Sequence, residues 1–157
     1  MASKQARKIP TNFKRLIDYF CCNFNDCFNF LASILSFKKI FLKFMPLTLF
    51  EKIINKEIPA EILYEDDISI VIEDINPQAP IHLLVIPKKV IPKLSDANKE
   101  DQEILGHLML VAGKIASRLK LDDAFRLVVN NGAKAGQSVF HLHLHLLSGR
   151  ALNWPPG

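Results

Sequence analysis

Three histidines near the C-terminal end of the chain are separated by single leucines, in the run His141-Leu142-His143-Leu144-His145-Leu146. Side chains two residues apart on a β-strand point to the same face, so the three imidazoles would share one face while the leucines enter the core. Packing alone does not require three titratable rings in a row. The pattern therefore indicates either a metal site or imidazoles that take part in catalysis.

Zinc is the main alternative for this run, because two histidines at positions i and i+2 are a common ligand pair. The first and third Cα atoms stand roughly 13 Å apart on a strand, at about 3.3 Å per residue. That separation is too large for one ion bound at about 2 Å. At most two of the three histidines would bind it, and the run has no adjacent acidic or cysteine ligand. We therefore expect no metal and no other cofactor.

The segment directly before the histidines, residues 131–138, reads Asn-Gly-Ala-Lys-Ala-Gly-Gln-Ser. Two glycines, free backbone N–H groups and short polar side chains are the components of an anion-binding loop. A phosphate held there would lie next to the row of imidazoles. The order of the two segments indicates attack by a neutral histidine nitrogen on phosphorus, which forms a phosphohistidine that water can cleave.

Hydrophobic periodicity predicts the elements that must position these residues. Helical patterns cover residues 47–55 and 99–120, the second with Asn98 as its N-cap. Apolar runs predict five strands, at residues 62–64, 68–72, 81–86, 125–129 and 139–147. Most strand connections are of hairpin length, so the predicted fold class is α+β, with a five-stranded antiparallel sheet and two helices. Gly106 and Gly113 share one line of the second helix and suggest close packing there.

The composition of the chain changes just before Met45. Residues 1–44 carry eight basic and two acidic side chains, all three cysteines and eight of the 11 Phe. Residues 45–157 are slightly acidic and have no cysteine, which excludes a disulfide framework there and argues against a nucleic-acid partner. We predict a poorly ordered basic leader at 1–44 and one folded domain at 45–157.

The leader is open to several interpretations. Its first 17 residues have basic and no acidic side chains, as in a mitochondrial presequence, but they lack the usual richness in Ser and Arg. The longest clean apolar run, residues 27–37, is roughly half a bilayer span, so membrane contact is not expected. An extension that precedes a start at Met45 is the simplest interpretation. The expected location is the cytoplasm, or the mitochondrion if residues 1–44 act as a presequence.

The run Gly136 to Leu147 matches the histidine triad signature, and the chain resembles the Hint branch of the histidine triad (HIT) family, the nucleoside phosphoramidases. The resemblance covers roughly residues 47–157. It is supported by Phe50-Glu51-Lys52-Ile53-Ile54, Ile58-Pro59-Ala60, Tyr64-Glu65-Asp66, Pro77-Gln78-Ala79-Pro80, Leu84-Val85-Ile86-Pro87-Lys88-Lys89, Leu105-Gly106-His107-Leu108 and Trp154-Pro155-Pro156-Gly157. The resemblance implies hydrolysis of purine nucleoside phosphoramidates, with cleavage of AMP-amine P–N bonds through a nucleotidyl-histidine.

The resemblance also implies roles for individual residues. His143 matches the nucleophile, His141 and His145 match the residues that orient it and contact phosphate, and His82 matches a further histidine beside the site. The polar loop groups that hold phosphate and assist the leaving group are matched by Asn130, Gly136, Gln137 and Ser138. The groups that hold the nucleoside are matched by Asp74 for the ribose hydroxyls and by Phe50, Ile53, Ile72 and Ile75 for the purine.

A homodimer is the expected assembly, with residues 125–129 pairing with their copy, and the resemblance implies that Val128 lies near the two-fold axis. The resemblance implies that Trp154 then approaches the partner's pocket. Two alternatives to the phosphoramidase remain: a nucleotide-binding interaction protein with incidental turnover, and a dinucleoside polyphosphate hydrolase. A pure binding protein would not need the set His143, Ser138 and Asn130.

Overall fold

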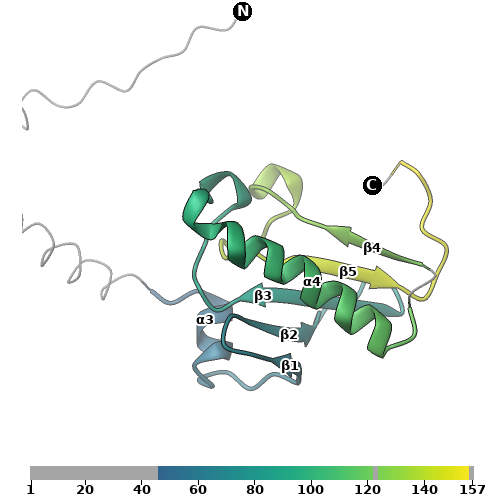
Figure 1. Cartoon of the computed structure of the whole chain (residues 1–157), viewed down its shortest axis with the longest axis horizontal. Helices are drawn as coiled ribbons and strands as arrows, with labels where there is room; N and C mark the ends of the chain where they lie inside the picture. The colour runs from purple at the N-terminus through teal and green to yellow at the C-terminus, as the bar shows by residue number, and fades with distance from the viewer. Residues whose placement is uncertain (1–45, 122–123, 156–157) are drawn as a thin grey trace, which may run out of the picture. The chain divides into compact units, whose positions relative to one another are not determined.

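The structure, a computed structural model, describes residues 46–121 and 124–155 (Figure 1). Its elements are α3 (Leu49–Ile54), β1 (Ile62–Glu65), β2 (Ser69–Glu73), β3 (Ile81–Pro87), α4 (Gln102–Arg118), β4 (Phe125–Val128) and β5 (Leu144–Ser148), with 3-10 turns at Leu94–Asp96, Lys99–Asp101 and Ala133–Ala135. No helix in this part of the chain is long and apolar enough to cross a membrane. The leader predicted at residues 1–44 lies outside the described residues.

The five strands form one antiparallel sheet in the order β1-β2-β3-β5-β4. With the two helices, this sheet confirms the predicted α+β fold class. β5 lies between β3 and β4, so that His145 is opposite Leu84 of β3 and Val128 of β4. The C-terminal strand is therefore hydrogen-bonded along both edges, which fixes the direction of its side chains.

Each face of the sheet carries a different helix. α4 lies along one face, where its buried residues share an apolar cluster with strand residues such as Val85 and Leu144 (Figure 1). On the other face, Phe50 and Ile53 of α3 share a second cluster with strand residues such as Leu84. Neighbouring strand residues alternate between the two clusters, as the period of two requires. His145, opposite Leu84, therefore faces the α3 side.

The helix predicted over residues 47–55 is observed as α3, with Thr48 as its N-cap. The Thr48 hydroxyl accepts a hydrogen bond from the Glu51 N–H at 3.1 Å, and Glu51 Oε2 accepts one from the Thr48 N–H at 2.7 Å. This reciprocal capping box satisfies two N–H groups that the helix itself cannot pair. It holds the beginning of a six-residue helix whose buried side chains are Phe50 and Ile53.

The helix predicted over residues 99–120 begins with a 3-10 turn, and α4 itself runs from Gln102 to Arg118. Asn98 caps the turn as predicted, in a capping box with Asp101. The close packing expected at Gly106 and Gly113 is not found among the described residues, because a Cβ added at either glycine would meet no atom within 4 Å. This line of the helix surface is open within the described chain.

The strand predicted over residues 139–147 is wrong at its beginning, since β5 runs only from Leu144 to Ser148. Its ladder with β3 reaches the pair Val85 and Leu144. β3 then ends at Pro87, which has no N–H to donate to a neighbouring strand. The ladder therefore stops before it reaches the first two histidines.

The segment before β5 instead crosses the end of β3. The ring of His141 hydrogen-bonds to the Pro87 carbonyl, and the Leu142 N–H donates to the Ile91 carbonyl at 2.7 Å. His141 and His143 thus precede the strand, while the intervening Leu142 is buried in the α4 cluster. The predicted division of histidines and leucines between two sides is retained even where the backbone is not a strand.

Candidate active site

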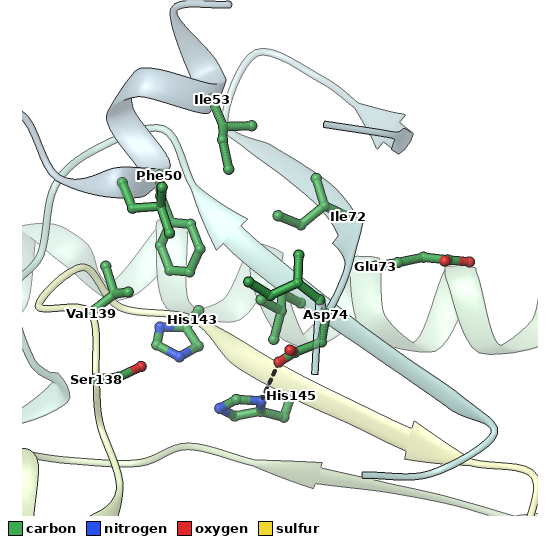
Figure 2. Close-up of a pocket in the computed structure, with 12 residues that line it drawn as sticks. Phe50, Ile53, Ile72, Glu73, Asp74, Ser138, Val139, His143 and His145 are labelled. Carbon is green, nitrogen blue, oxygen red and sulfur yellow. Dashed lines mark ion pairs between the residues drawn. The ribbon is translucent and has the colours of Figure 1, made fainter. Parts of the chain in front are cut away.

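A pocket of about 140 Å³ opens on the α3 side of the sheet (Figure 2). The pocket is lined by Leu49, Phe50, Ile53, Ile72, Glu73, Asp74, Ile75, Leu84, Ser138, Val139, His143 and His145. Eight of these twelve were predicted as site residues from the sequence, so the fold brings most of the predicted set to one cavity.

The hydrogen bonds of His143 fix which of its ring nitrogens carries the proton. Its Nδ1 lies 2.8 Å from the backbone carbonyl of His141, an acceptor only, so Nδ1 donates. A neutral ring protonated at Nδ1 has its lone pair on Nε2. The Phe50 ring packs edge-on against it, with centroids 5.1 Å apart. His143 therefore lines the pocket with its ring fixed by this hydrogen bond and with a lone pair on Nε2.

His141 is fully buried, and both of its ring nitrogens have partners. Its Nε2 lies 2.8 Å from the Pro87 carbonyl and must donate, which leaves Nδ1 to accept from the Thr48 hydroxyl at 3.0 Å. The ring is thus a neutral Nε2–H tautomer. It contributes its backbone carbonyl, and not its ring, to the orientation of His143.

His145 is held by a second histidine from β3. The N–H of Gln78 points at His82 Nδ1 from 3.1 Å, so the proton of neutral His82 is on Nε2. His82 Nε2 lies 2.9 Å from His145 Nδ1 and donates to it. The remaining nitrogen of His145, Nε2, therefore carries the proton, so its 3.5 Å contact with Asn130 Nδ2, which is itself a donor, is a close approach and not a hydrogen bond.

Burial keeps these imidazoles neutral. It is the main cause that lowers the pKa of His145 to about 4, and the neighbouring His143 and His82 lower that pKa further. Burial also lowers the pKa of His141 and of His82, although the Asp74 carboxylate acts against it at His82. These rings accordingly act at neutral pH as hydrogen-bonding dipoles, and the site gains no cationic charge from them.

Asp74 lies beside this pair of histidines at the end of β2. Its Oδ2 is 3.4 Å from His82 Nε2. The same oxygen is 3.9 Å from His145 Nδ1, the ion pair drawn in Figure 2. Its Oδ1 accepts a hydrogen bond from the Asn76 N–H at 2.8 Å. The carboxylate both lines the pocket and stabilises any positive charge that develops on His82 or His145.

Among the described residues, Asp74, His82 and His145 have potential ligand atoms within 4.8 Å of one another, so this group is tested as a zinc site. The sequence did not show this acidic neighbour, because Asp74 is distant along the chain from the histidine run. A zinc-bound histidine normally donates its other ring N–H to an acceptor. Here the other nitrogen of His82 faces the N–H of Gln78, a donor, so His82 Nε2 holds a proton and not a free lone pair. The three side chains therefore do not fit a zinc ion in this arrangement.

The loop before the histidines is shaped from inside by Gln137. Its side chain is buried, donates from Nε2 to the carbonyls of Pro92 and Val139, and accepts from the Gly132 N–H at 2.7 Å. Gly132 and Gly136 have φ values of 90° and 87°, which glycine adopts without strain. The Gln137 side chain therefore makes its hydrogen bonds to the backbone of this region. Ser138, which follows it, lines the pocket.

The other predicted site residues do not line this cavity. The His141 carbonyl contacts the His143 ring, His82 contacts His145, and Asn130 lies next to His145. Trp154 is 84% exposed on the C-terminal tail. The tail is held by Arg126 of β4, which donates to the carbonyls of Leu152 and Asn153 at 3.0 and 2.6 Å.

Sequence analysis missed several residues that contribute to the site. Leu49, Glu73, Leu84 and Val139 line the pocket. Leu49, Glu73 and Val139 are adjacent to predicted residues, and Leu84 lies two positions from His82 on β3. Thr48 was missed as well. Its spacing to Glu51 is typical of a capping box, but its bond to His141 joins residues 93 positions apart and has no local signature.

Comparison with known proteins places this geometry among related chains. A model of the HIT domain matches residues 55–152. An uncharacterized HIT-like protein of Synechocystis sp. is 59% identical over 110 residues, 70% of this chain and 96% of the relative. A 14 kDa zinc-binding protein of Zea mays is 49% identical over 112 residues, 70% of this chain and 88% of the relative. The crystal structure of a HIT family hydrolase from Legionella pneumophila is 46% identical with a TM-score of 0.69, over 71% of this chain and 100% of that chain.

Proposed function

The chain belongs to the HIT family, and we propose that it hydrolyses purine nucleoside phosphoramidates, as in the Hint branch, through a nucleotidyl-histidine on His143. The observation that carries the proposal is the hydrogen bond from His143 Nδ1 to the His141 carbonyl. It leaves Nε2 with a lone pair in a pocket that also holds Ser138 and His145. A nucleophile with a fixed tautomer and a nearby proton donor is the arrangement that two-step transfer requires.

The reaction follows from these positions. His143 Nε2 attacks phosphorus, a P–N bond to the ring forms, and the P–N bond to the amine breaks. The departing amine takes up a proton from the Ser138 hydroxyl, which lines the same pocket. Positive charge on the substituted ring is stabilised by the Nδ1–H bond to the His141 carbonyl. Water then attacks phosphorus and breaks the P–N bond to the ring. One of its protons replaces the proton that Ser138 gave to the amine, and the nucleoside monophosphate and neutral His143 are released.

The chemistry of the pocket favours a substrate with few negative charges. Among the described residues that line it, Glu73 and Asp74 are acidic and none is Lys or Arg. A polyphosphate would bring several charges without a cationic partner, whereas a phosphoramidate carries one on the reacting phosphorus. This difference supports the phosphoramidase over the dinucleoside polyphosphate hydrolase.

The apolar part of the pocket suits a nucleobase. Phe50 and Ile53 of α3 face Ile72 of β2 across the cavity (Figure 2). Ile75 also lines the cavity and is 96% exposed. We propose that the purine packs between these walls and that Asp74 accepts the ribose hydroxyls, since an ionised carboxylate can accept more than one hydrogen bond.

The decisive experiment replaces the nucleophile. A His143→Ala protein should lose turnover of an adenosine phosphoramidate by several orders of magnitude, while AMP binding stays nearly intact, because the two-step route itself is removed. His107→Ala is the matched control, since His107 lies on α4 and pairs with Asp66 outside the pocket. Wild-type turnover by the His143→Ala protein would contradict the mechanism. AMP binding by a wild-type protein without turnover would favour the nucleotide-binding alternative.

We further propose a homodimer that continues the sheet across β4. β4 is the last strand in the sheet order, and no other described strand pairs with its outer edge. On α4, Met109 and Leu110 are exposed beside the open surface at Gly106 and Gly113. This apolar surface is not packed against any other part of the described chain. A copy related by a two-fold axis would cover both surfaces. The exposed Trp154 would then be available to the partner's leaving-group site.

A further inference from the structure

We propose that Thr48 is a positioning residue for the nucleophile, through a hydrogen-bonded chain from the α3 N-cap to His143. This inference rests on the proposed function, and it adds a residue outside the histidine triad and outside the pocket lining. His141 makes two of the hydrogen bonds in this series. Its ring accepts from the Thr48 hydroxyl, and its backbone carbonyl accepts from His143 Nδ1.

The first step is the direction of the Thr48 hydroxyl. His141 Nε2 donates to the Pro87 carbonyl, so Nδ1 has a lone pair and needs a donor. The Thr48 hydroxyl is 3.0 Å away and supplies that proton. Its oxygen simultaneously accepts from the Glu51 N–H at 3.1 Å. One side chain therefore serves as the helix cap and as the donor to the buried ring.

The second step is the anchoring of residue 141. Its ring is fully buried and bound at both nitrogens, to α3 on one side and to the end of β3 on the other. This matters because residue 141 precedes β5 and lacks the ladder hydrogen bonds that would otherwise hold its backbone. The ring contacts replace them and fix the carbonyl that His143 Nδ1 uses.

The third step concerns His143 itself. Its tautomer is set by the His141 carbonyl, and a ring that turns away from this carbonyl can move its proton to Nε2, where it would block the nucleophile. Every buried side-chain polar atom of the described residues has a hydrogen-bond partner. Loss of the Thr48 donor would leave His141 Nδ1 as a buried acceptor without one, which costs free energy. The ring would then shift to find another donor, and the carbonyl would move with it.

The test compares matched variants of the full-length protein. Thr48→Ser keeps the hydroxyl, whereas Thr48→Val has nearly the same shape without it. Thr48→Asp keeps an oxygen that can cap α3 but offers no proton to His141 at neutral pH. Glu51→Ala removes the other half of the capping box and leaves the Thr48 hydroxyl in place, so it reports the effect of a weaker cap alone.

Two measurements are made on each protein. The first is kcat with an adenosine phosphoramidate together with the dissociation constant of AMP. The second is the tautomer of each histidine, from long-range proton–nitrogen NMR spectra. We expect Thr48→Ser and Glu51→Ala to remain near wild type. Thr48→Val and Thr48→Asp should lose about tenfold or more in kcat with AMP affinity within about twofold, as expected for a misplaced reacting group.

The NMR spectra separate this inference from the proposed function. In the wild type, His143 should be protonated at Nδ1 and His141 at Nε2. Thr48→Val should give mixed tautomers at His143. In Thr48→Asp the new carboxylate should raise the pKa of His141, which is otherwise faced by Glu51 of α3 and by His143.

Each outcome is decisive. Unchanged tautomers and kcat in Thr48→Val and Thr48→Asp would overturn the inference, as would an equal loss in Glu51→Ala. A wild type without phosphoramidate turnover would refute the proposed function, and the His143 tautomer in the variants would still support or overturn the role of Thr48.

Discussion

Acidification should destabilise this domain through its neutral buried histidines, and His145 gives the clearest magnitude. Its pKa is about 4 in the folded protein, against an ordinary value of 6.5. Because the folded pKa is the lower one, the unfolded chain binds the proton first, and stability is lost as the pH falls from about 6.5 towards about 4. At about 1.36 kcal/mol per pKa unit, the full effect is about 3 kcal/mol, of which about 2 kcal/mol falls between about pH 7 and about pH 4.5.

The assay measures urea unfolding at those two pH values for the wild type and for His145→Asn. Asparagine retains a polar group near the position of Nδ1, where His82 donates, but it does not titrate. The variant should lose about 2 kcal/mol less than the wild type on acidification, whatever its stability at neutral pH. Because the comparison is a difference of differences, any loss that does not depend on pH cancels.

The m-values serve as the internal control, since equal m-values at both pH values show that the same surface is exposed on unfolding. His82 and His141 also have lowered pKa values and remain in both proteins, so each should still lose stability in acid. Equal acid sensitivity of the wild type and His145→Asn would refute the claim that burial keeps His145 neutral.

Further predictions test the scaffold, the metal and the assembly. Asp66→Ala should lower the free energy of unfolding by about 2–3 kcal/mol in chemical denaturation, because this carboxylate accepts hydrogen bonds from β1, its own turn and α4. The variant Asp67→Ala at the exposed neighbouring residue should change it by less than about 0.5 kcal/mol. Gly149→Ala should lower the melting temperature, since its φ is 85° and an added Cβ would lie 2.9 Å from Pro80; an unchanged value would contradict the observed loop. Dialysis against a chelator should leave activity unchanged, and stoichiometric zinc whose removal abolishes activity would overturn the tautomer argument. Sedimentation should show a dimer for the wild type and a monomer for Val128→Glu, which buries a charge twice at the two-fold axis; a fully active wild-type monomer at micromolar concentration would refute the interface.

The sequence by itself determined the class of fold and the character of the site. Alternation of apolar and polar residues is a local property, so the strands and the separation of the histidines from the leucines could be predicted without tertiary information. The same holds for the helix beginning at Asn98, whose capping signal lies within three residues. Most of the eight predicted residues that meet in one pocket were assigned through the resemblance to the HIT family, because local periodicity does not show which residues from separate elements come together.

Only the tertiary structure decided how the histidines are supported. The strand prediction failed at His141 and His143 because the end of β3 at Pro87 lies far away in the sequence and terminates the ladder. The bond from His82 to His145 spans 63 residues, and the bond from Thr48 to His141 spans 93. Such contacts depend on strand order and on where each element ends, which no local pattern encodes. The tautomer that leaves a lone pair on His143 Nε2 is therefore a product of the folded chain.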